Sequence, residues 1–371
     1  MSMKIEIKST VTHEPLFSGE ADSLKELIES AVKAGVDLTL AELPDADLSV
    51  AQLSRAKFGS ADLSKGNLSG TNLENAHLTV AKMDGANLSN SKLFRARMLG
   101  ARLVRSSLVE ADMRKSVLIG ANLAGADMEK ADLSEADLSK TVLIGANLSG
   151  ALLPFANLAN ACLCGANLTA VALSAADLSR SDLSATDLSG SDLSGASMAG
   201  AKFNGANLSK ADLSFTDLPG AELIAADLRV ANLTGANLPG ADLSGANLAG
   251  ANLTGADLTD ADLSFMRHLI SNAPRLATIL DSAIGTAGEP QKTRAAVDVF
   301  FGLIVDLMPL DMAGGQGTVT AYLQQIERIV ESVRPASRYA MLARIAQTAE
   351  ARTNDARMVE DIFHELEDKP L

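Results

Sequence analysis

Histidine and cysteine are the residue types in this 371-residue chain that are most able to do chemistry, and their spacing predicts none. No histidine has a serine or cysteine and a carboxylate at the spacing of a catalytic triad. The four are His13, His77, His268 and His364. Cys162 and Cys164 supply two thiolates without a third ligand nearby, too few for a zinc site. The glycine-rich stretches lack the Gly-Lys-Ser/Thr of a phosphate loop. The sequence therefore predicts no enzyme, metal or cofactor.

Carboxylates recur at a regular spacing and are the main candidates for binding a partner. The predicted acidic surface comprises Asp177, Asp182, Asp187, Asp192, Asp212, Asp217, Glu222 and Asp227, which on a square coil would form regularly spaced rings. The same step of five governs a longer pattern. From Leu38 to Leu263, 46 successive fifth positions hold Leu, Met or Phe, each preceded two residues earlier by a small residue, mostly Ala. Five matches neither a helix nor a strand, so the chain is predicted to turn a corner in every repeat with two side chains inward.

Two of the corners can be identified from their residues. In Leu218–Ala221 and Leu238–Ala241, proline and then glycine occupy the centre of a four-residue turn. Proline fixes φ at about −65° and glycine accepts a positive φ, as a type II turn requires. These turns lie 20 residues apart, so four corners would close a square coil. Each corner is then predicted to stack on the same corner of the next coil.

The A(D/N)LxG pattern, as in Ala121–Gly125 and Ala251–Gly255, resembles the pentapeptide-repeat proteins. The resemblance covers about residues 36–264 and implies an all-β, right-handed quadrilateral β-helix. With roughly 4.8 Å between stacked strands, this gives a rod of about 55 Å. Columns of Leu fill its axis, so we expect no internal pocket and a severe effect from any inward charge.

Each end of the predicted solenoid needs a cover, because the last strands would otherwise be unpaired. Residues 1–35 are predicted to form a small α+β cap, with a strand at Lys4–Ile7, a turn at Glu14 and Pro15, and a helix after Asp22 or Ser23. Residues 265–371 are predicted to form a helical capping domain. Its helices are expected near 265–284, 291–308, 318–333 and 336–365.

The partner expected of the helical domain comes from the resemblance. Several pentapeptide-repeat proteins dimerise through C-terminal elements, so a homodimer through this domain is predicted. The alternative is a monomeric helical domain that caps the rod and binds a partner of its own.

Charge and composition limit the partners and the compartment. The net charge of −14 argues against binding nucleic acid or anionic membranes directly. Two cysteines, no signal-peptide pattern and no long apolar run favour the cytoplasm, with a secreted effector as an alternative. Charge is also uneven along the chain. Residues 37–115 hold 11 Lys or Arg and 9 Asp or Glu, and residues 116–262 hold 6 and 17.

A basic patch in the first half is predicted from positions that are 20 residues apart. Lys57, His77 and Arg97 should stack on one face, and Lys82 and Arg102 on the next. The predicted basic patch comprises Lys57, Lys82, Arg97 and Arg102. It fits an acidic partner, a contact between subunits, or an ordinary solvated surface.

An apolar belt is predicted near the middle of the rod, at positions that elsewhere hold Asp, Asn or Ser. Its residues are Val117, Ile119, Val142, Ile144, Leu152, Phe155 and Val171, with Cys162 and Cys164 beside them. A contiguous exposed apolar patch is typical of an interface. Sequence drift in a tolerant repeat is the alternative.

Function is expected to be binding. Gyrase-binding members of the resembled family are thought to mimic duplex DNA with a negative rod. The resemblance therefore implies a DNA-mimicking modulator of a type II topoisomerase, DNA gyrase or topoisomerase IV, that could confer drug tolerance. Gyrase-protecting relatives often carry loops and more axial Phe, whereas this chain has no loops and only Phe58 and Phe203 on the axis. Asp or Asn is also the family consensus whatever the function. The rival hypothesis is a structural or adaptor scaffold, with the rod as a spacer and the apolar belt and helical domain as docking sites.

Overall fold

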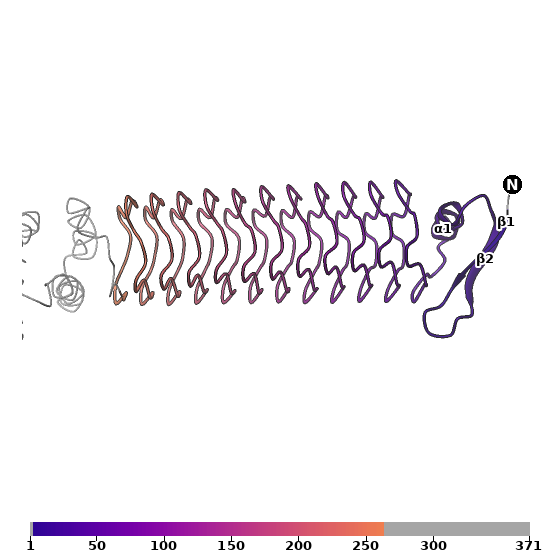
Figure 1. The fold of residues 1–371 in the computed structure, drawn as a ribbon, viewed down its shortest axis with the longest axis horizontal. Helices are drawn as coiled ribbons and strands as arrows, with labels where there is room; N and C mark the ends of the chain where they lie inside the picture. Colours follow the sequence, from indigo (N-terminus) through magenta and orange to yellow (C-terminus); the bar gives the residue numbers. More distant parts are fainter. Residues whose placement is uncertain (1–2, 263–371) are drawn as a thin grey trace, which may run out of the picture.

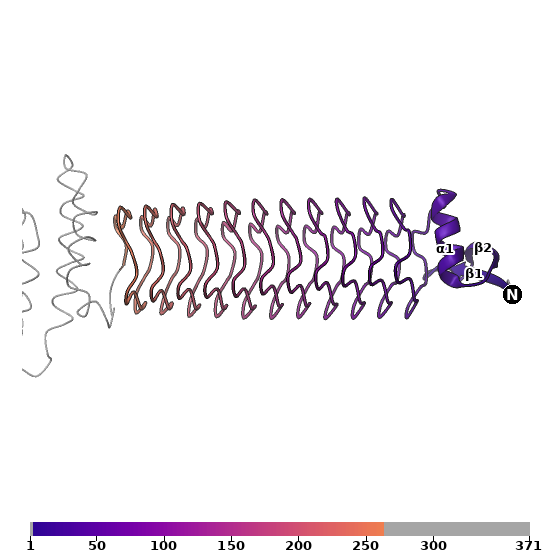
Figure 2. The same ribbon diagram turned by 90° about the horizontal axis from the view of Figure 1, so that it is seen from above.

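The repeats wind into a straight rod of stacked square coils (Figures 1 and 2). The computed structural model describes residues 3–262, and the predicted C-terminal helical domain lies outside them. Each outward residue pairs in parallel with the residue 20 positions later, from Asp37 with Lys57 to Asp242 with Asp262. A coil therefore contains four five-residue sides, as predicted.

The axis of the rod is filled by the two inward positions of every repeat. All the Leu, Met and Phe residues at the five-residue spacing from Leu38 to Leu258 are buried, and from Ala41 onward so are the small residues two positions before them. Phe58 and Phe203 are the largest side chains among them. Because each side of a coil contributes one long and one short side chain to the axis, the long side chains can meet there without overpacking. The predicted core is confirmed.

Backbone hydrogen bonds between coils hold the stack together, as one repeat illustrates. The N–H of Leu123 donates to the carbonyl of Val142 in the next coil at 2.7 Å, and that of Asn122 donates to Ala101 in the previous coil at 2.9 Å. The N–H of Gly125 reaches Ile144 at 2.9 Å. Three of the five N–H groups are therefore used between coils, and such ladders account for buried backbone polar groups.

Every corner is a turn with a positive φ at its third residue. In Leu218–Ala221, Gly220 has φ +61°, and the N–H of Ala221 donates to the carbonyl of Leu218 at 3.2 Å. These features agree with the predicted turn. Glycine is not required, however, because residues such as Val80 and Val230 adopt φ +59° and +61°. The inter-coil ladder imposes the corner even where the side chain disfavours it.

A small cap covers the first coil (Figure 1). Strands β1 (Met3–Lys8) and β2 (Pro15–Ala21) form an antiparallel pair, and helix α1 (Leu24–Lys33) follows. Ser23 begins the helix, because its hydroxyl accepts the N–H of Glu26 at 3.2 Å. The predicted strand and helix are thus confirmed, with Ser23 rather than Asp22 as the N-cap. The turn lies at residues 10–12, earlier than predicted, because Pro15 is already the first residue of β2.

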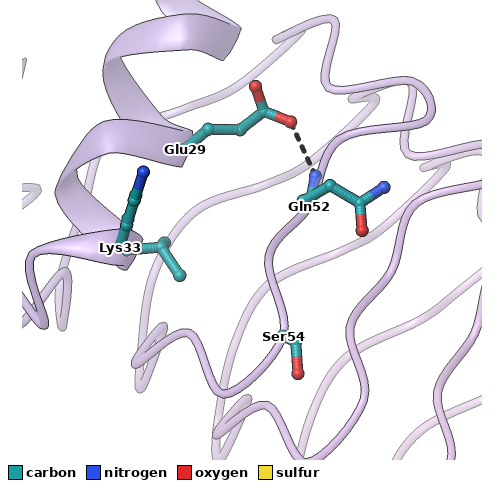
Figure 3. Close-up of a pocket in the computed structure, with 5 residues that line it drawn as sticks. Glu29, Lys33, Gln52 and Ser54 are labelled. Atoms are coloured by element: carbon teal, nitrogen blue, oxygen red, sulfur yellow. Dashed lines mark hydrogen bonds between the residues drawn. The ribbon is translucent and has the colours of Figure 1, made fainter.

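The cap supplies acceptors for the exposed edge of the first coil. The N–H of Glu42 donates to the carbonyl of Lys8 at 2.8 Å. The N–H of Gln52 donates to the carboxylate of Glu29 on α1 at 2.7 Å, as Figure 3 shows. These bonds block further pairing on that part of the edge. Within residues 3–262, no helix is long and apolar enough to cross a membrane.

Candidate binding surfaces

The rod presents four faces, each defined by one column of outward residues spaced by 20. We name them by their first members: face 1 begins at Asp37, face 2 at Glu42, face 3 at Asp47 and face 4 at Gln52. Residues in one column are neighbours along the rod. Residues five apart in the sequence lie on adjacent faces.

The eight predicted carboxylates form two rings around the rod, as their spacing predicts. Asp177, Asp182, Asp187 and Asp192 lie on faces 1, 2, 3 and 4, and the other four repeat this order from face 4 onward. The rings arise because a step of five residues moves the side chain around a corner. Negative charge therefore surrounds this part of the rod.

The Asp or Asn in front of each Leu has a structural task. Its Oδ1 accepts the N–H of the residue two positions later, which the inter-coil ladder leaves unused, except before Pro219 and Pro239, which have no N–H. Asp187 accepts from Ser189 at 3.0 Å, and Asn122 accepts from Ala124 at 3.1 Å. Asn side chains add a second bond along the column, as when Asn207 donates to Asp187 at 3.0 Å. The consensus residue thus satisfies the backbone of its own turn.

These hydrogen bonds favour the ionised carboxylate. Bonds from Ser49, first through its hydroxyl and then through its N–H, lower the pKa of Asp47. Hydrogen bonding to Arg229 is the largest cause of the lowered pKa of Asp227. Asp47 and Asp227 therefore carry their charge at neutral pH while also holding their turns.

Cations of the same chain offset part of the negative charge in the second half. Lys202 lies 3.5 Å from Glu222, and Arg229 lies 2.6 Å from Asp227. Residues 177–262 still hold 12 Asp or Glu against 4 Lys or Arg. Their four coils span about 20 Å, over which duplex DNA would carry about 12 phosphates. The net charge density is therefore roughly two-thirds of that of duplex DNA.

The predicted basic patch is stacked as expected. Lys57 pairs with His77 and His77 with Arg97 on face 1, whereas Lys82 pairs with Arg102 on face 2. Arg102 lies 2.9 Å from Asp84 and is partly neutralised. Among residues 3–262, Lys57, Lys82 and Arg97 form no ion pair. A binding role for the patch stays a prediction.

The predicted apolar belt is divided among three faces, and one member is not on the surface. Val117 lies on face 1, Val142 on face 2 and Leu152 on face 4. Ile119 and Ile144 lie two residues later, in the columns that follow faces 1 and 2. Phe155 lies at the corner after Leu152 and is 68% exposed. Val171 is 1% exposed. Its assignment to the belt was wrong, because it stands two residues before Leu173 at the small inward position, and a branched side chain still fits there.

Several exposed apolar and aromatic side chains were missed in the sequence. Leu99, 44% exposed, lies one coil from Ile119 in the column that follows face 1. The ring of Phe215 lies over the corner at Gly235, 20 residues later. Arg95 and Arg114 approach the ring of Phe94 at 5.0 Å and 5.6 Å from its centroid. The 20-residue spacing could have predicted three of these pairs, namely Leu99 beside Ile119, Phe215 beside Gly235 and Phe94 beside Arg114.

The two cysteines are close together, with 3.6 Å between their Sγ atoms. Burial, and then hydrogen bonding to Cys162, raises the pKa of Cys164 to about 12, so its neutral thiol is favoured. No group of three or more His, Cys, Asp or Glu in the described part of the chain could hold a metal ion. The two cysteines, which belong to one repeat, are therefore two adjacent free thiols.

A surface pocket of about 360 Å³ lies between α1 and the first coil (Figure 3). It is lined by Glu29, Val32, Lys33, Gln52 and Ser54. The Glu29 carboxylate already accepts the backbone N–H of Gln52. The hydrogen bond between Glu29 and Gln52 in this pocket therefore joins the cap to the rod.

Comparison with solved structures found several similar repeat proteins. HetL, involved in heterocyst differentiation regulation in the cyanobacterium Nostoc, is 33% identical, with 65% of this chain and 98% of HetL covered and a TM-score of 0.37. A protein of the Arabidopsis thaliana thylakoid lumen is 34% identical, with 36% and 90% covered and a TM-score of 0.31. A structure of QnrB1, a plasmid-mediated fluoroquinolone resistance protein, is 27% identical, with 39% and 76% covered and a TM-score of 0.19. These low TM-scores carry no argument about function.

Comparison with curated proteins found no match. The family model for pentapeptide repeats, in contrast, matches more than half of the chain. The matched segments are 34–70, 67–99, 96–134, 131–169, 172–209, 206–238 and 226–264. They coincide with the stacked coils and with the inward Leu columns. The chain therefore belongs to the pentapeptide repeat family.

Proposed function

We propose that the chain is a non-enzymatic binding protein whose negative half occupies a positively charged groove built for duplex DNA. The most concrete partner is a type II topoisomerase, DNA gyrase or topoisomerase IV. Competition with DNA for the groove would lower the amount of drug-stabilised complex and so confer drug tolerance. The observation that supports this proposal is the negative charge on all four faces of residues 177–262.

Charge on every side suits the environment that a duplex meets in a closed groove. A basic groove contacts both backbones of duplex DNA, so a mimic needs charge around its circumference. The filled axis makes the rod rigid, and rigid ligands lose little conformational entropy on binding. Binding through these charges predicts an affinity that weakens at high salt.

The structure suggests variants that remove charge without removing the turns. Asn keeps the Oδ1 acceptor, so Asp177→Asn, Asp182→Asn, Asp187→Asn and Asp192→Asn together should leave the rod folded. A matched control changes four turn-holding carboxylates in the first half. It combines Asp37→Asn, Asp47→Asn, Asp62→Asn and Asp112→Asn.

Gyrase supercoiling, with and without a quinolone, is then measured for the three full-length proteins. We expect the wild type and the control to change supercoiling or drug-stabilised cleavage, and the ring variant to lose most of this effect. A wild type without any effect on either topoisomerase would contradict the proposal. So would a ring variant that acts as strongly as the wild type.

A second candidate is a structural or adaptor scaffold, in which the rod is a spacer. The outward apolar residues favour it, because Val142 and Leu152 stand at outward positions where most repeats have Asp or Asn. In this case Val142→Asp and Leu152→Asp abolish assembly with a partner and leave the rod folded, whereas the Asn variants above have no effect. Dimerisation through residues 265–371 and a cytoplasmic location are part of both proposals.

A further inference from the structure

Face 1 differs from the other faces in how its charges are paired. Ion pairs occur on the other three faces or in the columns beside them, for example Lys202 with Glu222 and Arg114 with Asp112. Within residues 3–262, no outward residue of face 1 forms an ion pair. Its charges are therefore available to an external partner.

If a second copy of face 1 is turned end over end and laid against the first, residues of opposite charge come to lie opposite each other. The column reads Asp37, Lys57, His77, Arg97, Val117, Asp137, Asn157, Asp177 and Ser197. Counting outward from Val117, Arg97 stands opposite Asp137, and Lys57 stands opposite Asp177. The intervening positions hold His77 and Asn157, and no like charges coincide.

We propose that face 1 binds face 1 of a second copy of this chain, with the two rods antiparallel. The two-fold axis lies in the interface, perpendicular to the rods, at the level of Val117. Such an axis places Arg97 of each copy against Asp137 of the other, and Lys57 against Asp177. The contact is self-complementary, as a two-fold interface requires.

Apolar side chains occupy the centre of this contact. Val117 and Ile119 lie at the axis, and Leu99 lies one coil away with 44% of its surface exposed. Away from the axis, the column beside face 1 holds small residues such as Gly59 and Ala159. This arrangement places an apolar core inside a charged rim, which is the usual organisation of a protein interface.

The dimensions predict a weak contact. Lys57 and Asp177 are six coils apart, so the paired region is about 30 Å long and one rod face wide. That area is at the lower end for specific interfaces. We therefore expect a dimer that dissociates at low concentration and at high salt.

Exchanging the charges of Arg97 and Asp137 tests whether these residues lie opposite each other in the dimer. Sedimentation velocity of the full chain in 50 mM and 500 mM NaCl measures the dissociation constant for wild type, Arg97→Glu, Asp137→Lys and the double variant. Each single variant should weaken the salt-sensitive association by about tenfold or more, because two symmetry-related pairs become repulsive. The double variant should restore it. Lys82→Glu, an unpaired cation on face 2, should leave it unchanged.

Disulfide trapping separates this contact from association through any other part of the chain. In a Cys162→Ser, Cys164→Ser background, Val117→Cys should form a cross-linked dimer under mild oxidation. Asp217→Cys, five coils away on the same face, should not. Failure of Val117→Cys to cross-link, or association that ignores the charge of residues 97 and 137, would overturn the proposal.

Discussion

The side chain before each inward Leu decides whether a turn keeps its last N–H group satisfied. Asp187 shows the arrangement, since its Oδ1 accepts both the N–H of Ser189 and the side-chain amide of Asn207. A buried or half-buried N–H group without a partner costs more than an average hydrogen bond contributes. The acidic character of the rod is thus partly a consequence of turn chemistry.

Replacing Asp187 separates charge from turn stability. Asp187→Ala should lower the free energy of unfolding by about 1 kcal/mol, because the N–H of Ser189 loses its acceptor. Asp187→Asn should change it by less than about 0.5 kcal/mol, because an amide oxygen still accepts both bonds. Urea unfolding followed by circular dichroism measures both values. Equal losses for Ala and Asn would show that the charge matters more than the acceptor.

Hydroxyls at the small inward position provide a second test. Ser106 donates to the carbonyl of Leu103 at 2.8 Å, whereas the buried Oγ of Ser116 has no hydrogen-bond partner. Ser116→Ala should raise the free energy of unfolding by about 1 kcal/mol, since an unpartnered hydroxyl is removed. Ser106→Ala, the matched control, should leave it unchanged or lower it. The melting temperatures of both variants test this prediction. A lower melting temperature for Ser116→Ala than for the wild type would contradict it.

Cys164 gives a prediction about pH. Its pKa is raised in the folded chain to about 12, mainly by burial. The neutral thiol therefore stabilises the fold below the ordinary thiol pKa, and this contribution is lost as the pH rises toward the folded value. In Cys162→Ser, alkylation of Cys164 by iodoacetamide at pH 8 should be at least about tenfold slower than in urea, and its rate should still rise above pH 10. Equal rates in the folded and unfolded protein would refute the raised pKa.

At the scale of the element, the corner is defined by a backbone conformation rather than by a residue type. Both Gly220 and Gly235 have positive φ, of +61° and +64°. A Cβ at residue 220 would meet no atom within 4 Å, whereas one at residue 235 would lie 2.8 Å from the ring of Phe215. Corners therefore differ in what the next coil places over them.

A pair of alanine substitutions measures this difference. Gly220→Ala and Gly235→Ala both place a side chain at a positive φ, at a cost of about 1 kcal/mol. Gly235→Ala should cost about 0.5 kcal/mol more, because the Phe215 ring must leave its position. Adding Phe215→Ala should remove this extra loss of stability, and the midpoints of urea unfolding measure the difference. The explanation fails if the two glycine variants remain equal.

The cap shows how much of an element can be predicted locally. Its first strand and its helix follow from alternation and a capping serine close together in the sequence. The contact of Glu29 with the N–H of Gln52 could not be predicted, because it depends on how α1 lies across the first coil. Local patterns thus predicted the element, and its docking required the assembled fold.

At the scale of the whole molecule, the cap keeps one end of the stack from acting as a template. A chain that begins at residue 36 should associate end to end or aggregate, because the N–H groups of Glu42 and Gln52 lose their acceptors. Glu29→Ala, which removes one acceptor, should remain soluble with a slightly lower melting temperature. Light scattering distinguishes the two. A monodisperse truncated chain would show that the cap is dispensable for solubility.

The sequence by itself determined the coil, the inward columns and the turns, because a fixed period of five assigns each side chain to the axis or the surface. It also determined which outward residues stack, since neighbours in a column are 20 positions apart. The spacing also places Val171 at an inward position, which its assignment to the apolar belt overlooked. Only the tertiary structure decided which charges are paired, as in Arg102 with Asp84, and that the carboxylates hold the turns. These properties depend on side-chain conformations and on contacts between coils, which the spacing of residues does not specify.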